Sequence, residues 1–511
     1  MNLIGRRHFF GNCVAATGAL ATDLSFLKPL GLARAQEIEV SKDWMSHRPE
    51  IMPIVRLIRT TPRNACVDVF LKELEQGLSY QRFLSALFLT ASETGDLHQL
   101  AQIYAAHRIS QSVRIEERLL PLFWALDRVK QGQDYEDKSH FLSDLKGALP
   151  SADTAPAVFA DGMRKADKTQ VERAVIALAR NEGPRQAMNR LWKYAARDLG
   201  GTLGHLPIGV ANAWRTLETI GWQHAEPALR YMARESCRPE GDSTFASNER
   251  RVRETVPLLP PDWASNESNR SLTLELYTLL RGAHPEDVGD LICASLIQRS
   301  AKAGAIWDAI SLAAADLIYR HRTGGNIIGG ALIHAITSSN ALRYGFQHVS
   351  DSETRLIQLL QAAGSVAAGF IGPAAKNQRL RDLDLVEDLS QLDDGGPDQA
   401  SELFAELPKK GDNYSQQHAS EREASDQACR ATFQFLKRPN ASRVFMNTAR
   451  TLLCAKASSD PHDLKYPAAA FEDAFLVSSE WRPYILASTV HALHGAKSPD
   501  STVLQQVRNA I

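Results

Sequence analysis

Four histidines are the residues of this sequence whose type and spacing point most directly to chemistry. His98, His205, His334 and His462 recur at intervals of 107, 129 and 128 residues, each near the start of a segment with helical periodicity. If these segments are equivalent units, their equivalent positions face a common axis. The sequence therefore predicts that the four imidazoles converge on one internal cavity.

Imidazole titrates near neutral pH and is the commonest protein ligand for transition metals. The four histidines are therefore candidate ligands of Fe, Cu, Mn or Zn, in preference to haem, although the sequence does not identify the cofactor. No EXXH or HXXXH pair of the di-iron or zincin type accompanies them. A metal-free polar pocket lined by the same histidines is one alternative, and a structural role as helix caps or packing residues is another.

Arginine recurs with the same regularity, nine or ten residues after the histidine in three of the units. A guanidinium presents a planar fork of donors, so these arginines are candidates to hold a carboxylate or another anion. An ion pair with an equally regular glutamate is the structural alternative. The arginines are Arg108, Arg215 and Arg343, and the glutamates are Glu117, Glu226 and Glu353.

Two asparagines, Asn212 and Asn340, lie in the middle of the predicted helices that carry Arg215 and Arg343. A buried amide in such a position needs hydrogen-bond partners. Asn212, Asn340 and Arg215 are therefore candidates to bind a cofactor or a ligand carbonyl, and bridging between helices is the structural alternative.

The rest of the chain has the pattern of an all-α protein. Of its 511 residues 44% are hydrophobic and 23% charged, and its formal net charge of -1 gives no basic field for nucleic acid. Strand-like alternation is almost absent. We predict quasi-repeated antiparallel helical hairpins around a central cavity, without a substantial β-sheet. Residues 36–511 would form a single domain with mobile loops near 236–270 and 375–425.

The first 35 residues resemble a twin-arginine signal peptide. Arg6 and Arg7 precede a mostly apolar region, and Ala33-Arg34-Ala35 has the small-x-small pattern of a cleavage site. An amphipathic N-terminal helix is the alternative. The signal predicts the twin-arginine export machinery as a partner and a periplasmic or secreted location. No later run reaches the ~18 apolar residues of a membrane span, so no integral span is expected.

Three phrases resemble the questin oxidase-like family, helical proteins related to fungal enzymes that cleave anthraquinones oxidatively. They are Gly-Gly-x-x-x-His at residues 200–205, LIHAITSSNALR at 332–343 and PHDLKYPAAAFEDA at 461–474. They occur in the order expected for the family. Other phrases, such as RLLPLFWALDRVK, are similar to a group of secreted bacterial proteins of unassigned function.

The resemblance implies a helical cavity lined by His205, His334 and His462. In an enzyme these histidines would bind the cofactor or move protons, and Lys465 or Arg343 would hold an oxyanion that develops on the substrate. One hypothesis is thus an exported helical oxidoreductase that acts on a small apolar or aromatic organic substrate. The other is a non-catalytic periplasmic binding or scaffold protein, in which the repeated residues only satisfy hairpin junctions.

Overall fold

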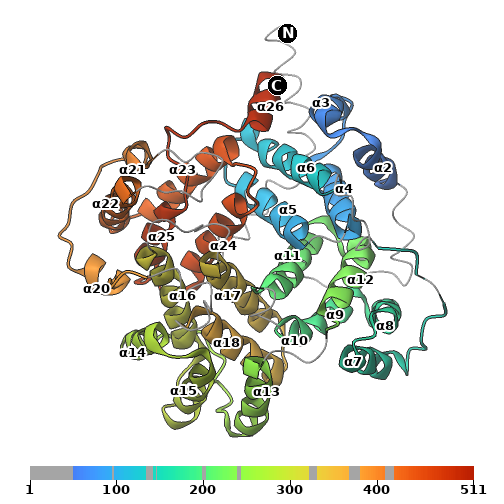
Figure 1. Cartoon of the computed structure of the whole chain (residues 1–511), viewed down its shortest axis with the longest axis horizontal. Helices are drawn as coiled ribbons and strands as arrows, with labels where there is room; N and C mark the ends of the chain where they lie inside the picture. The colour runs from blue at the N-terminus through green and yellow to red at the C-terminus, as the bar shows by residue number, and fades with distance from the viewer. Residues whose placement is uncertain are drawn as a thin grey trace.

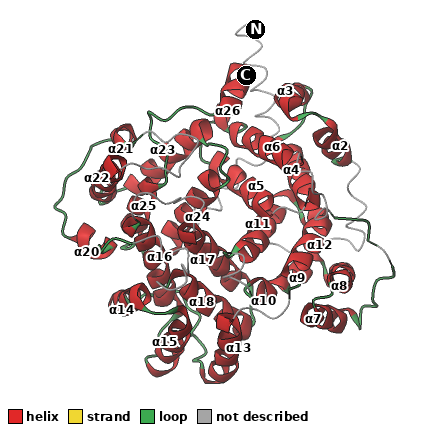
Figure 2. Ribbon diagram, viewed as in Figure 1, coloured by secondary structure: helices red, strands yellow, loops and turns green. Residues whose placement is uncertain are grey.

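The computed structural model describes residues 50–94, 97–133, 142–145, 147–197, 203–238, 243–321, 331–367, 380–408 and 419–510. Within these ranges every regular element is a helix, and no strand is present, which confirms the all-α prediction (Figure 2). The predicted signal peptide at 1–35 and the Gly-Gly pair at 200–201 lie outside the described residues.

The α-helices of the first half are α2 (Met52–Thr60), α3 (Cys66–Glu75), α4 (Tyr80–Thr94), α5 (Leu97–Ser110), α6 (Leu120–Gln133), α7 (Ala155–Lys165), α8 (Lys168–Glu182), α9 (Pro184–Asn189), α10 (Leu191–Ala195), α11 (His205–Ile220), α12 (Ala225–Ser236) and α13 (Ser243–Thr255). Those of the second half are α14 (Arg270–Gly282), α15 (Pro285–Gln298), α16 (Ala303–Arg320), α17 (Ala331–His348), α18 (Ser352–Val366), α20 (Leu385–Ser390), α21 (Ala400–Glu406), α22 (Ala419–Leu436), α23 (Ala441–Lys456), α24 (His462–Leu476), α25 (Arg482–Ser488) and α26 (Thr502–Ala510). Short 3-10 turns occupy Arg63–Ala65, Ile115–Glu117, Trp222–His224, Val256–Leu258 and Thr489–His491.

Four helical hairpins organise the molecule: α5–α6, α11–α12, α17–α18 and α24–α25. The first helix of each hairpin packs against the first helices of two others, in the order α5, α11, α17, α24 and back to α5. These inner helices form a closed ring, and the remaining helices surround it (Figure 1). The predicted pairing of helices into quasi-repeated hairpins is therefore present, and the units follow one another around the ring.

The sequence of the inner helices suits burial on most sides. In α11 and α17 almost every described side chain is buried, so neither helix has the single apolar stripe of a surface helix. Outer helices such as α2 bury one face only, with Ile54, Val55 and Ile58 turned inward. The inner ring is thus the core around which the amphipathic helices pack.

Local signals define where the helices start. The side chains of Asp167, Asn269, Asp351 and Asp384 accept hydrogen bonds from backbone N–H groups in the first turns of α8, α14, α18 and α20. Before α11 the chain turns through Gly204, whose φ of 78° lies in the left-handed region. This turn brings His205 to the first position of an inner helix.

Two regions expected as loops contain helix. Residues 243–255 form α13, which packs on α15 and α18, so the prediction of a loop throughout 236–270 is wrong. Between 375 and 425 the described residues include α20, α21 and the start of α22. Both regions are rich in residues typical of loops, but their few apolar side chains, such as Phe245, Leu385 and Phe404, become buried against neighbouring helices.

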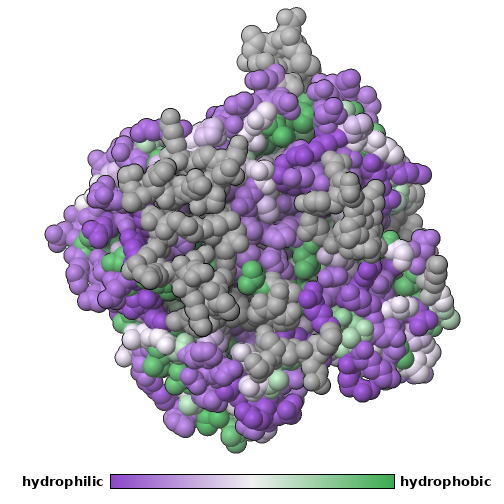
Figure 3. Space-filling model, viewed as in Figure 1, coloured by the Kyte–Doolittle hydropathy of each residue, from purple (hydrophilic) through white to green (hydrophobic). Residues whose placement is uncertain are grey.

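The molecular surface is predominantly hydrophilic in the view of Figure 3, with apolar residues in small separate patches. Among the described helices, none is both long enough and apolar enough to span a membrane.

Candidate active centre

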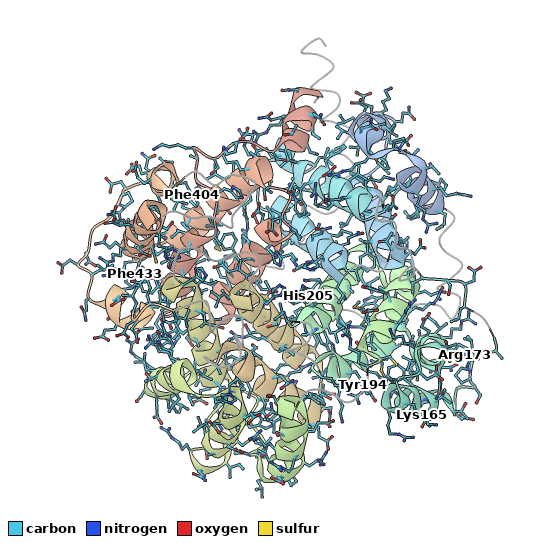
Figure 4. All side chains as sticks on the ribbon, in the orientation of Figure 1. Lys165, Arg173, Tyr194, His205, Phe404 and Phe433 are labelled. Atoms are coloured by element: carbon cyan, nitrogen blue, oxygen red, sulfur yellow. The ribbon has the colours of Figure 1, made fainter. Side chains whose placement is uncertain are left out.

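The four repeated histidines lie together where the inner helices begin. Ring centroids are 4.4 Å apart for His98 and His205, 4.3 Å for His205 and His334, and 5.1 Å for His334 and His462. The rings of His98 and His462, at 5.5 Å, close the circle. In Figure 4, His205 lies near the middle of the molecule. The predicted convergence of these side chains is confirmed.

The inner helices run parallel to one another. His98, His205, His334 and His462 all lie in the first turn of their helices. Each helix N-terminus carries a partial positive charge of about half a unit, so four such ends favour an anion at this point.

Lys465 adds a cationic group to the cluster. Its Nζ lies 2.7 Å from His98 Nδ1, and the side chain is 5% exposed. An ammonium can only donate hydrogen bonds, so His98 Nδ1 accepts and the proton of the neutral ring lies on Nε2. His98, His205, His334, His462 and Lys465 together form the histidine–lysine centre. The predicted site residue Lys465 therefore belongs to it.

The loop before α24 fixes His462 in place. Asp460 Oδ1 lies 2.7 Å from His462 Nδ1 and accepts a second hydrogen bond from the backbone N–H of the same residue. The helix of the first hairpin, α6, holds this loop from the other side, because Trp124 and Arg128 donate to the carbonyl oxygens of Ser458 and Ser459. Residues from the first and last hairpins thus position one imidazole.

A second carboxylate anchors the same loop. Asp463 Oδ2 accepts hydrogen bonds from the backbone N–H of Ser458, at 2.6 Å, and from His494 Nε2, at 2.9 Å. The side chains of Asp463 and His494 are both buried. Although burial disfavours the ionised carboxylate, these hydrogen bonds and His494 hold the pKa of Asp463 below its usual value. The ionised carboxylate of Asp463 therefore holds this loop in place next to the histidines.

The environment keeps His98, His334 and His462 neutral at physiological pH. Burial lowers the pKa of His98 to about 2, and Lys465 with the neighbouring histidines contributes. Burial also lowers the pKa of His334 and of His462, and at His462 the carboxylate of Asp460 opposes the shift. His98 and His205 remain partly exposed, so the centre is not sealed from solvent.

The hydrogen bonds specify tautomers. His462 Nδ1 faces a carboxylate, which only accepts, so this nitrogen carries the proton of the neutral ring. His462 Nε2 is then a lone pair, and it lies 3.2 Å from His334 Nε2, which must donate. Nδ1 of His334 is left as a buried lone pair without a hydrogen-bond partner among the described residues.

The centre does not fit a metal ion as its side chains lie. Two imidazole nitrogens bound to one tetrahedral ion at 2.0–2.1 Å would be about 3.3 Å apart, close to the separation of the His334 and His462 Nε2 atoms. However, the Nδ1 of His98 faces the Lys465 ammonium, which repels a cation. Among the described residues no three His, Cys, Asp or Glu side chains are placed to hold a metal ion.

The predicted cofactor-binding residues lie in a separate layer, six to ten residues along the helices, or about 9–15 Å from the histidines. Arg215 donates to Asn212, Asn340 and Glu472, with a distance of 2.6 Å to the carboxylate of Glu472. Asn340 in turn donates to Asp473 at 2.9 Å. We call Asn212, Arg215, Asn340, Glu472 and Asp473 the arginine layer. Hydrogen bonds join its members across three inner helices, although Arg215 Nε has no partner among the described residues.

Arg343 was expected to hold a substrate oxyanion, and the structure does not bring it to the histidines. It is 3% exposed and donates to the carbonyl oxygen of Leu476 and to Ser311. The glutamate partner expected for Arg215 was Glu226, but the partner is Glu472 of α24. In the fourth unit the position equivalent to the arginine is acidic, and the ion pair forms around the ring instead of within one hairpin.

The residues missed by the sequence analysis are Asp460, His494 and two acids of α24, Glu472 and Asp473. Asp460 stands in a loop with no counterpart in the other units, and its only signal is its position two residues before His462. Glu472 and Asp473 lie inside the segment 461–474, at positions equivalent to those of the repeated arginines. Their opposite charge was a sequence signal for ion pairs with those arginines.

Compared with models of protein families, with curated proteins and with solved structures, the chain matches none.

Proposed function

We propose that this chain is an enzyme, an oxidoreductase for an apolar or aromatic organic substrate, and that the histidine–lysine centre is its active site. The observation that carries the proposal is the convergence of four histidines from four separate hairpins on one point, beside a buried lysine. Hairpin junctions that needed histidine only for local capping would not require the four rings to contact one another.

The chemistry of the centre supports a role in proton transfer and anion stabilisation. Neutral imidazoles with lone pairs accept protons, and a carboxylate behind one of them, as Asp460 stands behind His462, stabilises the charge that results. Lys465 and four helix N-termini stabilise negative charge on a substrate oxygen. An oxidation would also need an external electron acceptor.

The proposal of export rests on the first 35 residues alone. The resemblance to the questin oxidase-like family likewise stays a prediction, because no family model matches the chain. Its three phrases do carry three of the four histidines and Lys465, and this agreement supports the choice of an oxidative reaction on an aromatic ring system.

The test is turnover by the full chain, expressed with its own N-terminus. Dioxygen uptake and product formation would be followed over a panel of phenols, quinones and hydroxylated anthraquinones. We expect His334→Ala and His462→Ala to abolish turnover, whereas His284→Ala, a change in an exposed capping histidine, should not. Binding without turnover would favour the non-catalytic periplasmic protein. Elemental analysis of the same samples tests the metal hypothesis.

A further inference from the structure

The histidine–lysine centre contains an ordered path for a proton. The path begins at the buried lone pair of His334 Nδ1, passes through the 3.2 Å contact between the Nε2 atoms of His334 and His462, and ends at the 2.7 Å contact with Asp460. Three consecutive polar side chains with fixed donor and acceptor roles are more than packing requires, since packing alone would leave no preference for tautomers.

We infer that the substrate of this centre carries an acidic hydroxyl group, a phenol or an enol, and that its proton is relayed from His334 to His462 beside Asp460. The inference rests on the proposed function, since it takes the centre as the place where substrate binds. The substrate oxygen would approach His334 Nδ1, the open acceptor of the path.

The transfer balances without any redox change. The substrate O–H bond breaks, and its proton forms a bond with His334 Nδ1. The proton on His334 Nε2 moves to His462 Nε2. His462 becomes an imidazolium whose Nδ1–H still donates to the carboxylate of Asp460, and the substrate is left as an oxyanion.

The electrostatics of the centre favour this direction. Burial and Lys465 disfavour an imidazolium at either ring. At His334 the neighbouring histidines add to this effect, whereas at His462 the carboxylate of Asp460, at hydrogen-bond distance, opposes it. The oxyanion would lie among four helix N-termini and Lys465, where negative charge is stabilised. The centre therefore places the proton on His462, beside Asp460, and the negative charge on the substrate oxygen, beside Lys465.

In this path His334 is the catalytic residue and Asp460 is a positioning residue. The probe for the test is 4-nitrophenol, because its phenolate absorbs visible light. In the wild-type chain, at about one pH unit below the pKa of the free phenol, the ratio of ionised to neutral probe should be at least tenfold higher for bound than for free probe. His334→Gln and Asp460→Asn should each remove most of this ionisation, Asp460→Asn without loss of folding.

A matched control is Asp500→Asn. The Asp500 side chain has an exposure of 31% against 23% for Asp460, but its partners are Lys456 and Arg508. This variant should ionise the probe as the wild type does. Equal ionisation in wild type and Asp460→Asn, or binding of the probe only in its neutral form, would overturn the relay.

A second probe separates this inference from the proposed function. The methyl ether 4-nitroanisole has the same ring but no acidic proton, and we expect it to bind at least tenfold more weakly than 4-nitrophenol. If both probes bind equally well and His334→Gln weakens both, the centre remains a substrate site and only the acidic-hydroxyl inference fails. If turnover of the substrate panel is also indifferent to His334→Ala, the proposed function fails with it.

Discussion

The same inner helices build two polar regions of opposite character. In the histidine–lysine centre the residues are neutral bases around one lysine, and a buried acceptor, His334 Nδ1, has no partner among the described residues. In the arginine layer a guanidinium, two amides and two carboxyl groups are linked, and Arg215, Asn340 and Glu472 bond to one another, although Arg215 Nε also has no partner among the described residues. A polar group held by several bonds to its neighbours stabilises the ring, whereas a ring nitrogen outside such a network is available to a ligand. The comparison therefore assigns a stabilising role to the arginine layer and a chemical role to the histidine–lysine centre.

The largest effect on stability should come from the arginine layer. Arg215→Ala leaves the carboxylate of Glu472, 18% exposed, without its guanidinium, so we expect a loss of about 3–5 kcal/mol in the free energy of unfolding. Denaturant titration measures it. The exposed pair Arg299–Glu275 is the control, and Arg299→Ala should change little. Equal effects of the two changes would contradict the assignment.

A smaller effect should distinguish two glycines of the inner helices. A Cβ at Gly345 of α17 would lie 2.7 Å from the rigid ring of Trp192, so Gly345→Ala should cost about 1–3 kcal/mol. At Gly209 of α11, close to the histidines, the added methyl meets only the flexible ends of Leu97 and Met232. Gly209→Ala should therefore leave the unfolding free energy nearly unchanged. The reverse order of thermal stabilities would contradict this difference in packing.

The two regions should also respond to acid with opposite signs. His98 and His334 have lowered folded-state pKa values. The unfolded chain therefore takes up more protons below pH ~6.5, and their contribution to stability is lost as pH falls. Burial raises the pKa of Asp473 to about 7, against Arg343, Asn340 and Arg215. Between pH ~7 and ~4 the folded state binds the extra proton, so acid increases the contribution of this carboxyl.

Each group changes stability by at most about 1.4 kcal/mol per pH unit. Unfolding curves from pH 7 to 4 should therefore be flatter for His98→Asn than for the wild type, because the variant lacks a group that binds protons preferentially in the unfolded chain. They should be steeper for Asp473→Asn, which lacks a group with the opposite preference. Parallel curves for the three proteins would show that neither group binds protons differently in the folded and the unfolded chain, and would contradict this prediction.

The smallest effect on stability should come from Lys465→Met. A buried ammonium is replaced by an apolar chain of similar length, so we expect a change below about 1 kcal/mol or a slight gain. Ionisation of 4-nitrophenol should nevertheless fall at least tenfold, because the oxyanion loses its nearest cation. A large loss of stability with ionisation intact would place Lys465 among the structural residues instead.

The convergence of the histidines could be predicted because it follows from repetition. Units with similar sequences adopt similar folds, and equivalent positions of such units face the axis of the ring. The positions of His205 and His334 could therefore be predicted from the sequence. The partners could not be predicted in the same way. Asp460 belongs to an unrepeated loop, and Glu472 breaks the repeat by replacing a basic position with an acidic one. Ion pairs across the ring depend on which helices become neighbours. The order of the units along the chain does not give this information.

The closure of the ring has a consequence for the synthesis of the protein. The contact between His98 and Lys465 joins residues 367 positions apart, and Trp124 reaches the loop before α24 across a separation of 334. At typical translation rates of 5–20 residues per second, the two halves of the centre leave the ribosome roughly 20 to 70 seconds apart. The ring can therefore close only after the last hairpin has been synthesised. Any chain that stops before α24 has no centre, so the assembled histidines report that nearly the whole polypeptide has been made.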